Sequence, residues 1–350
     1  MTRRYVVLAP NAFESSAKTA HGVIRYGLDP VVAVIDPSCA GRSVREALAY
    51  LDCDAPIVAN LDQALVERPT ALLIGTAPIG GELGSLRAIV REAIDAKLDI
   101  VSGLHTMLSD DIELAEAARR SGVSLVDLRS VPESPIFSGA AYAIEAPILL
   151  TVGNDCNVGK MSVALELCAA AERAKRRWAF VPTGQTGIAI AGWGTAIDRT
   201  ISDFAAGASE QLVLQAAREH PDAIVVEGQG AINHPAYGAV TLALMYGCAP
   251  DGLLLVCAPH RRTIKSYDTP TLRYRDAIRL HEALLASVKP ARVLGIALNT
   301  YGLTANEARD EIERARSETG LPADDLLRFG GDPFYAAVAA SLHKQMALAS

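Results

Sequence analysis

The feature that most constrains the fold is a glycine-rich segment, residues 153–162, which reads Gly-Asn-Asp-Cys-Asn-Val-Gly-Lys-Met-Ser. The apolar run before it, residues 147–152, has the composition of a buried strand, and residues 160–175 favour a helix. In such a strand-loop-helix unit the backbone N–H groups surround a phosphate, the helix N-terminus adds positive potential, and a lysine ammonium meets the phosphate oxygens. The segment therefore predicts a phosphate-binding loop, called the P-loop below, in preference to a structural glycine turn.

Two features separate this segment from the common P-loop. Five residues instead of four lie between its glycines, and Met161 stands where a Ser or Thr hydroxyl would bind Mg²⁺. Ser162 lies about 100° further around the helix, so it would need a shifted geometry to replace that hydroxyl. The spacing resembles that of dethiobiotin synthetase-type P-loop proteins. The predicted phosphate-binding residues are Gly153, Asn154, Asp155, Cys156, Asn157, Val158, Gly159, Lys160, Met161 and Ser162.

The rest of the chain alternates short β-branched runs with helical patterns, which is typical of parallel sheets covered by helices. At 350 residues it is long enough for two domains. The predicted fold class is α/β, with an N-terminal Rossmann-like parallel sheet domain over residues 1–138 and a C-terminal P-loop NTPase-like parallel sheet domain over residues 146–350. Residues 129–145 contain two prolines and little periodicity, so they form the predicted linker.

Two features of the first half are compatible with either a ligand-binding role or a structural role. Asp36 ends a predicted strand, where a carboxylate can accept bonds from a ribose, but the first turn lacks GxGxxG and a strand-end role is favoured. The glycines that follow the next predicted strand suit either an anion-binding loop or a plain turn. They are Gly75, Gly80, Gly81 and Gly84.

Polar residues follow several predicted strands of the second half, where open α/β sheets bind ligands. Glu227 ends the strand over residues 223–226, so it suits a base or a Mg²⁺ ligand, or a cap of the next turn. His234 suits a base or a hydrogen-bond donor as well as a structural histidine. Asn299 follows the last predicted strand and suits either nucleobase recognition or a turn.

Two loops are predicted to bind substrate. Thr183, Gln185 and Thr186 offer hydroxyl and amide groups after the strand over residues 178–181, with a simple turn as the alternative. Arg261 and Arg262 belong to a basic cluster after the strand over residues 252–257, and guanidinium groups suit carboxylate or phosphate oxygens. The sequence favours substrate binding by this basic cluster no more than it favours a solvated loop without a ligand.

Composition narrows the classes of partner. With 33 basic and 40 acidic residues the formal charge is −7, which predicts no general attraction to nucleic acid or to an anionic membrane. No apolar stretch approaches the ~20 residues that span a bilayer, and the start of the chain lacks a secretory pattern, so we expect a cytoplasmic protein. The six cysteines show no CxxC pair and no metal-ligand spacing, which predicts reduced thiols and no metal site. The apolar content favours a homo-oligomer.

Motifs along nearly the whole chain resemble an uncharacterised P-loop domain family that includes D-glutamate N-acetyltransferases. In the second half the resemblance rests on the P-loop, on Thr183-Gly184-Gln185-Thr186-Gly187, on Glu227-Gly228-Gln229-Gly230 and on His234-Pro235. In the first half it rests on Lys18-Thr19-Ala20, Ile24-Arg25-Tyr26, Val32-Ala33-Val34-Ile35-Asp36 and Ala40-Gly41.

The resemblance implies transfer of an acetyl group from acetyl-CoA to the amine of an acidic, D-glutamate-like amino acid. In that reading Lys160 and the loop amides hold CoA phosphates, Glu227 or His234 accepts the amine proton, and Arg261 or Arg262 anchors the substrate carboxylates. Two alternatives stay open. One is an ATP- and Mg²⁺-dependent enzyme that activates a carboxylate, as dethiobiotin synthetase does, and the other is a non-catalytic nucleotide or CoA sensor.

Overall fold

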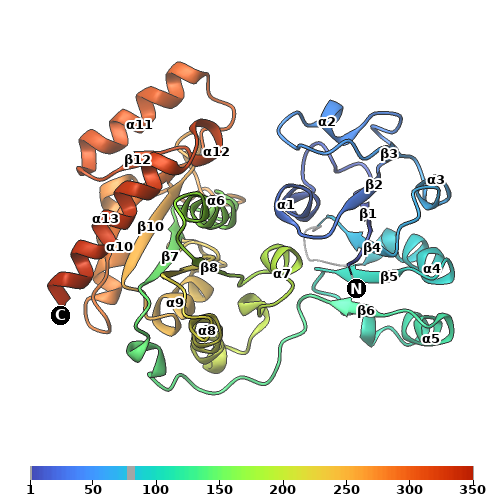
Figure 1. Cartoon of the computed structure of the whole chain (residues 1–350), viewed down its shortest axis with the longest axis horizontal. Helices are drawn as coiled ribbons and strands as arrows, with labels where there is room; N and C mark the ends of the chain where they lie inside the picture. Colours follow the sequence, from blue (N-terminus) through green and yellow to red (C-terminus); the bar gives the residue numbers. More distant parts are fainter. Residues whose placement is uncertain (1, 77–82, 350) are drawn as a thin grey trace. The chain divides into compact units, whose positions relative to one another are not determined.

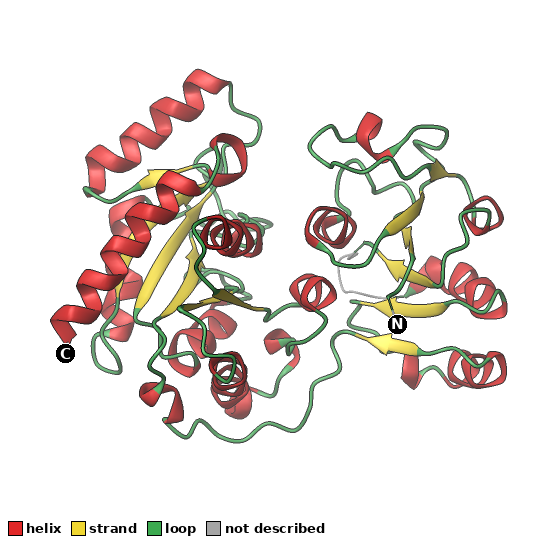
Figure 2. Cartoon of the chain, in the orientation of Figure 1, coloured by secondary structure: helices red, strands yellow, loops and turns green. Residues whose placement is uncertain are grey.

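The computed structural model describes residues 2–76 and 83–349, which form two compact units (Figure 1). The first unit contains the chain up to Val131 together with Gln185–Ala196, and the second contains Pro132–Gly184 and Ile197–Ser350. Both units are α/β structures with a parallel six-stranded sheet, so the predicted fold class is confirmed (Figure 2). Among the described residues, no helix combines the length and the apolar character that crossing a membrane requires.

The sheet of the first unit has the strand order β3-β2-β1-β4-β5-β6, the arrangement of a Rossmann fold. Its strands are β1 (Tyr5–Leu8), β2 (Val31–Ile35), β3 (Ile57–Val58), β4 (Ala71–Ile74), β5 (Asp99–Ser102) and β6 (Leu125–Asp127). Its helices are α1 (Lys18–Tyr26), α2 (Val44–Ala47), α3 (Leu61–Leu65), α4 (Arg87–Asp95), α5 (Ile112–Ser121) and α7 (Gln185–Ala191), with 3₁₀ turns η1 (Gly84–Leu86) and η2 (Leu108–Asp110). Strands β1 and β4 are buried throughout, because helices cover both faces of a parallel sheet.

Helix α7 comes from the second half of the sequence but packs within the first unit, against α1. The hydroxyl of Thr186 lies 3.0 Å from that of Thr19 in α1, and the Gln185 side-chain oxygen accepts a bond of 2.9 Å from Arg129. A Cβ atom at Gly103 would lie 2.7 Å from the Gln185 side chain, so this glycine makes room for it. The predicted boundary near residue 146 did not anticipate that residues 185–196 return to the first unit.

The strand-end interpretation of Asp36 agrees with its contacts. Its buried carboxylate accepts bonds from the backbone N–H groups of Asn11, Phe13 and Ser38 and from the Ser38 hydroxyl. Since a carboxylate has about four acceptor positions, these bonds fill it and hold the loop after β1, which leaves no role in ribose binding. Gly80 and Gly81, of the glycine loop suggested by the sequence, lie outside the described residues.

The sheet of the second unit has the order β12-β11-β10-β7-β9-β8. Its strands are β7 (Ile148–Gly153), β8 (Trp178–Val181), β9 (Ala223–Val226), β10 (Gly252–Cys257), β11 (Arg292–Leu298) and β12 (Ala323–Asp324). Its helices are α6 (Lys160–Arg173), α8 (Ser202–Ala217), α9 (Gly238–Gly247), α10 (Tyr274–Leu285), α11 (Ala305–Thr319), α12 (Leu326–Phe329) and α13 (Asp332–Ala349), with 3₁₀ turns η3 (Ala140–Ala143) and η4 (Ile197–Arg199). Strand β7 lies between β10 and β9, so the loops after these three strands meet at one edge of the sheet.

His281 of α10 makes the second unit sensitive to acid. The ring is fully buried, Nδ1 lies 2.7 Å from the Ala277 carbonyl oxygen, and Nε2 has no hydrogen-bond partner in the described part of the chain. Burial lowers the pKa of His281 from 6.5 to about 4, so the folded state keeps it neutral while the unfolded chain binds a proton. Its contribution to stability is present above pH 6.5 and is lost as the pH falls toward 4.

We expect His281→Phe to be less sensitive to acid than the wild type. Between pH 7.5 and pH 5 the wild type should lose about 2 kcal/mol more of its free energy of unfolding than the variant. Urea unfolding at the two pH values measures the difference, and equal losses in the two proteins would show that another group causes the acid sensitivity.

Candidate functional site

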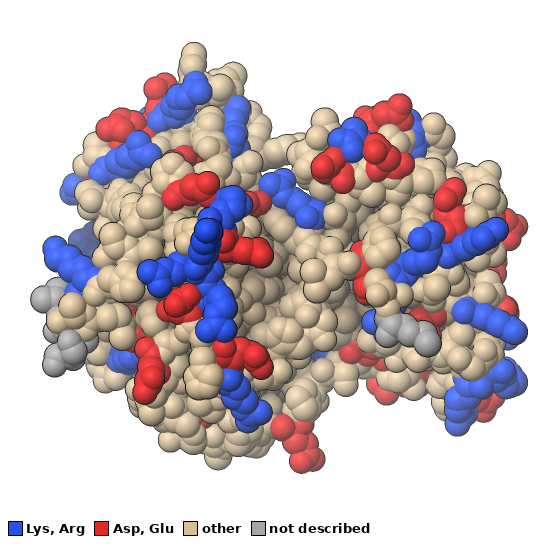
Figure 3. Space-filling model, viewed as in Figure 1, with Lys and Arg blue, Asp and Glu red and all other residues tan. Residues whose placement is uncertain are grey.

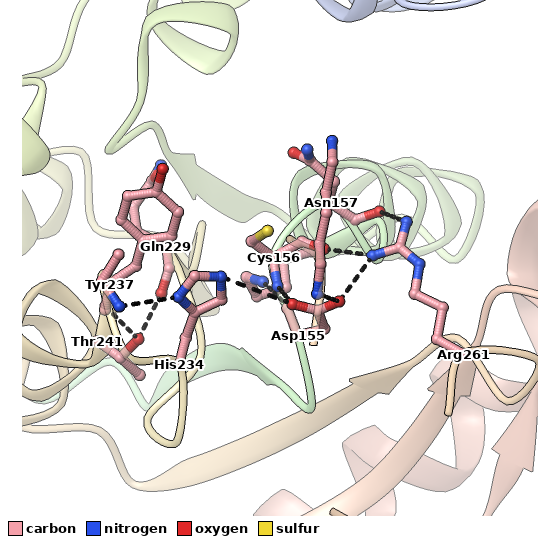
Figure 4. A network of polar contacts seen from close by, with 11 residues as sticks. Asp155, Cys156, Asn157, Gln229, His234, Tyr237, Thr241 and Arg261 are labelled. Carbon is pink, nitrogen blue, oxygen red and sulfur yellow. Dashed lines mark hydrogen bonds and ion pairs between the residues drawn. The ribbon is translucent and has the colours of Figure 1, made fainter. Parts of the chain in front are cut away.

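Three loops at the carboxyl edge of the second sheet form the candidate site. They are the P-loop after β7, residues 227–237 after β9, and residues 258–270 after β10, called the basic loop below. Figure 4 shows His234 and Arg261 on opposite sides of Asp155, which belongs to the P-loop. The structure therefore brings together side chains that are up to 106 positions apart in the sequence.

The P-loop turns sharply into α6 through two residues with left-handed backbone angles, Asn157 (φ 52°) and Gly159 (φ 107°). Lys160 is 6% exposed, and its ammonium donates to the Asp155 carbonyl oxygen at 2.9 Å. A Cβ atom at Gly228 would lie 1.6 Å from the Thr151 carbonyl oxygen of β7 and 3.1 Å from Lys160 Cδ, so only glycine lets the loop after β9 approach β7 this closely. The ammonium is thus held inside the curve of the loop, where a bound phosphate would meet it.

Met161 and Ser162 occupy the start of α6. The Met161 side chain is buried and Ser162 is half-buried. A thioether is a poor ligand for Mg²⁺, which prefers oxygen. The position that supplies the Mg²⁺ hydroxyl in the common P-loop therefore does not fit a metal in this chain.

Arg261 of the basic loop holds the P-loop in place. Its guanidinium donates to the Asp155 carboxylate at 3.1 Å, to the Cys156 carbonyl oxygen at 2.7 Å and to the Asn157 carbonyl oxygen at 3.2 Å. The same carboxylate accepts a bond of 3.0 Å from the backbone N–H of Lys265. Because Asp155 is fully buried, its charge needs these partners. The contacts favour a positioning role for Arg261 over the substrate contact expected from the sequence.

Glu227 fixes the loop after β8. Its Oε2 atom accepts bonds from the backbone N–H groups of Thr183 at 3.1 Å and Gly184 at 3.3 Å. The Thr183 hydroxyl donates to the Glu227 carbonyl oxygen at 2.6 Å and accepts a bond of 3.1 Å from the Gln229 side chain. The Glu227 side chain therefore holds the loop after β8, and not the turn that follows Glu227 itself. A catalytic role for Glu227 stays a prediction.

His234 lies beside the P-loop with a fixed orientation. Its Nδ1 atom accepts a hydrogen bond of 3.2 Å from the Ala236 backbone N–H, and its Nε2 atom faces Asp155 Oδ1 at 4.0 Å. The ring contacts Tyr237 and, edge-on, Tyr267 of the basic loop, at centroid distances of 4.5 and 5.3 Å. Burial lowers the pKa of His234, so the ring is neutral at physiological pH.

Asp155, Cys156 and His234 each place a potential metal-ligand atom within 4.8 Å of the other two. Their hydrogen bonds do not suit a cation. The carboxylate already accepts bonds from Arg261 and Lys265, and since Nδ1 of His234 is an acceptor, the proton sits on Nε2, the nitrogen that faces the group. Burial and the nearby Asp155 charge raise the pKa of the Cys156 thiol, so the thiol stays protonated at neutral pH. The Asp155 carboxylate accepts a bond of 2.6 Å from the Cys156 N–H, and His234 lies beside this pair without a hydrogen bond to either residue.

Of the other residues that the sequence predicted for the site, some contact the P-loop and others lie elsewhere in the structure. Asn299 donates to the Val158 carbonyl oxygen at 3.2 Å and accepts a bond from the Tyr301 N–H, which favours a loop-holding role over nucleobase recognition. Gln185 and Thr186 make their polar contacts in the first unit, so the structure does not add them to this site. Arg262 is exposed and lines an open hollow of about 700 Å³ formed by the basic loop.

Sequence reasoning did not anticipate the roles of three residues at the site. Lys265 acts through its backbone N–H, and Tyr267 packs on His234, yet neither role has a signal in residue type or spacing. The sequence predicted Asn154 as a phosphate-binding residue. Its buried Oδ1 is an acceptor that has no partner among the residues described. An acceptor oxygen suits a ligand N–H or O–H better than a phosphate oxygen.

Comparisons with known proteins agree with this architecture. Residues 135–335 match the model of a domain of unknown function described as the DUF1611 C-terminal P-loop domain, and residues 37–131 match the DUF1611 N-terminal Rossmann-like domain. A crystal structure of a DUF1611 family protein from Anabaena variabilis is 36% identical, covers 97% of this chain and 100% of that chain, and superposes with a TM-score of 0.92.

Two relatives carry the name D-glutamate N-acetyltransferase. The one from Tritonibacter scottomollicae is 36% identical over 287 residues, which are 80% of this chain and 84% of the relative. The one from a Pseudoalteromonas species is 35% identical over 268 residues, which are 75% of this chain and 80% of the relative. The chain therefore belongs to the DUF1611 family, in which a Rossmann-like domain precedes a P-loop domain.

Proposed function

We propose that this protein is an acetyl-CoA-dependent N-acetyltransferase that acts on an acidic amino acid of the D-glutamate type. The observation that carries the proposal is the named activity of two relatives that align with three quarters or more of the chain. In the reaction the substrate amine forms a bond to the acetyl carbon, the carbon–sulfur bond breaks, and the CoA thiol leaves with the proton that the amine gives up.

The P-loop is the proposed site for the CoA phosphates. Lys160 and the loop amides offer positive charge and donors, and Arg261 offsets the Asp155 charge beneath the loop. The buried Met161 side chain supplies no oxygen for Mg²⁺, so the site suits holding phosphates more than transferring one.

This arrangement separates the P-loop from the reacting centre. About 14 bonds join the CoA pyrophosphate to the acetyl carbon, a reach of roughly 16 Å when the arm is extended, as for a peptide of similar length. Side chains that touch the P-loop are therefore expected to bind and orient CoA. The sequence predicted Glu227 and His234 as bases. For Glu227 that role stays a prediction, and its side chain holds the loop after β8, whereas His234 lies beside the P-loop.

Two variants of Glu227 distinguish a base from a loop-holding residue. Glu227→Gln keeps an oxygen for the two backbone N–H groups, so we expect acetyl-CoA affinity and turnover to stay within about threefold, since both of these hydrogen bonds are kept. Glu227→Ala leaves both buried donors unpaired, which costs about 1–3 kcal/mol for each. A turnover loss of about 100-fold in Glu227→Gln at unchanged affinity would instead identify Glu227 as the base.

Arg262 is the proposed anchor for a substrate carboxylate. Among the described residues no carboxylate pairs with it, and it lines the hollow of the basic loop beside Arg261. A guanidinium binds a carboxylate through two parallel hydrogen bonds. This anchor accounts for a preference for acidic substrates.

The proposed activity is tested by thiol release. The purified protein is incubated with acetyl-CoA, EDTA and single amino acids of either chirality, and mass spectrometry identifies the N-acetyl product. We expect release of one CoA thiol per acetylated amine with D-glutamate or a similar acid. The absence of product with every acidic amino acid at high protein concentration would contradict the proposal.

The loop spacing, which resembles dethiobiotin synthetase, favours one second candidate, an ATP-dependent enzyme that activates a carboxylate. An enzyme of that kind releases ADP only in the presence of Mg²⁺, and a carboxylic acid substrate increases the rate of release. Measuring ADP in the same reactions, with Mg²⁺ and ATP in place of EDTA and acetyl-CoA, separates the two activities.

A further inference from the structure

The hydrogen bonds of His234 determine which of its ring nitrogens carries the proton. Nδ1 accepts a bond of 3.2 Å from the Ala236 N–H, and a nitrogen that accepts a bond from an amide has no proton of its own. In the neutral ring the proton is therefore on Nε2. Since a base needs a free lone pair, this ring is a donor toward the P-loop and not a base.

The orientation of the ring is fixed by its neighbours. Tyr237 stacks on one side and Tyr267 contacts the ring edge-on, and the His234 side chain is 1% exposed. Nε2 faces Asp155 Oδ1 at 4.0 Å, which is too far for a hydrogen bond. Within the described part of the chain, no acceptor lies within hydrogen-bonding distance of Nε2. The donor thus points to the Asp155 carboxylate of the P-loop from beyond hydrogen-bonding distance (Figure 4).

Burial is the main cause that keeps the ring neutral. Burial and the Lys160 ammonium lower the pKa of His234, and the Asp155 carboxylate opposes them in part. The other groups that face the ring are the Cys156 thiol, whose pKa burial raises, and the two tyrosines. A bound phosphate would therefore meet a neutral N–H donor beside the Lys160 ammonium.

We propose that His234 is a phosphate-binding residue of the P-loop, whose neutral Nε2–H group donates to a phosphate oxygen held by Lys160 and the loop amides. This inference rests on the phosphate-binding part of the proposed function and does not depend on the acetyl transfer. It assigns to the loop after β9 a direct role in binding the anion.

Two variants test the donor. A glutamine places its side-chain N–H near the position of Nε2, whereas a shorter asparagine does not reach it. We expect His234→Asn to bind acetyl-CoA and inorganic pyrophosphate about 10- to 100-fold more weakly, the loss of a hydrogen bond to a charged group, and His234→Gln to recover most of that affinity. Calorimetric titration at pH 7.5 gives the dissociation constants, and thermal unfolding shows whether each variant is folded.

A second readout concerns the protonation state of the ring. Nitrogen NMR of the wild type should show His234 as the Nε2–H form from pH 7.5 to 8.5, with and without pyrophosphate. Pyrophosphate affinity should not follow a His234 titration in that range, because the ring stays neutral.

Three results would overturn the inference. They are wild-type affinity for pyrophosphate in folded His234→Asn, an Nδ1–H or doubly protonated ring at pH 7.5, and the absence of pyrophosphate and acetyl-CoA binding in the wild type. If pyrophosphate binds as expected but no amine is acetylated, the role of His234 stands and only the proposed activity fails.

Discussion

Lys160→Ala is expected to bind acetyl-CoA at least about 100-fold more weakly than the wild type, because a buried ammonium bonded to phosphate oxygens supplies charge as well as hydrogen bonds. In the structure this ammonium is held by the Asp155 carbonyl oxygen, so it is already placed inside the loop before a ligand arrives. Calorimetric titration gives the two dissociation constants, whose ratio corresponds to about 2.7 kcal/mol or more.

Two further variants show whether the affinity depends on the ammonium charge of Lys160 or on the packing of its aliphatic stem. Lys160→Met keeps most of the aliphatic stem, which lies near Gly228, and should lose affinity as Lys160→Ala does. Lys344→Ala removes an exposed lysine of α13 and should bind acetyl-CoA as the wild type does. Wild-type affinity in Lys160→Met would show that the ammonium does not contact the ligand.

Arg261→Met is expected to destabilise the second unit by about 1.5–3 kcal/mol, because the buried Asp155 carboxylate loses its charged partner and keeps only its bonds from backbone N–H groups. The Asp155 carboxylate is fully buried, and two loop carbonyl oxygens would also lose their donor. Urea unfolding measures the loss, and acetyl-CoA affinity should fall with it because the P-loop loses its support.

A double-mutant cycle with Asp155→Asn tests the cause of that loss. Once Asp155 is neutral, removing Arg261 should cost much less than in the wild type, since no charge is left uncompensated. Arg262→Met, in the same loop, is the matched control and should change only the KM for the acidic substrate. The opposite result, in which Arg261→Met alters only that KM, would restore the substrate role that the sequence suggested for Arg261.

Local patterns predicted the elements that position the site. The strand before the P-loop, the helix after it, and the strands that end near Glu227 and before the basic loop all lie where the sequence placed them. The reason is that strand ends, glycines and the P-loop motif are determined by residues close together in the chain. The same rules missed α9 and α13, whose apolar and small residues surround the helix and leave no clear 3.6-residue pattern.

Long-range contacts decide the roles that the sequence left open. Arg261 meets Asp155 across 106 positions, and Thr186 meets Thr19 across 167. Residue type and spacing do not show whether an arginine binds a substrate or a buried carboxylate, since both present the same oxygens. For the same reason the donor role of His234 depends on one backbone N–H, that of Ala236, which only the folded loop brings into place.

The most direct test of the account is calorimetric titration of the wild-type protein with acetyl-CoA in EDTA and, separately, with ATP and Mg²⁺. We expect acetyl-CoA to bind without a divalent cation, and we expect inorganic pyrophosphate to compete with acetyl-CoA for the P-loop. Binding of ATP with Mg²⁺, together with no binding of acetyl-CoA, would contradict the account and favour the ATP-dependent enzyme.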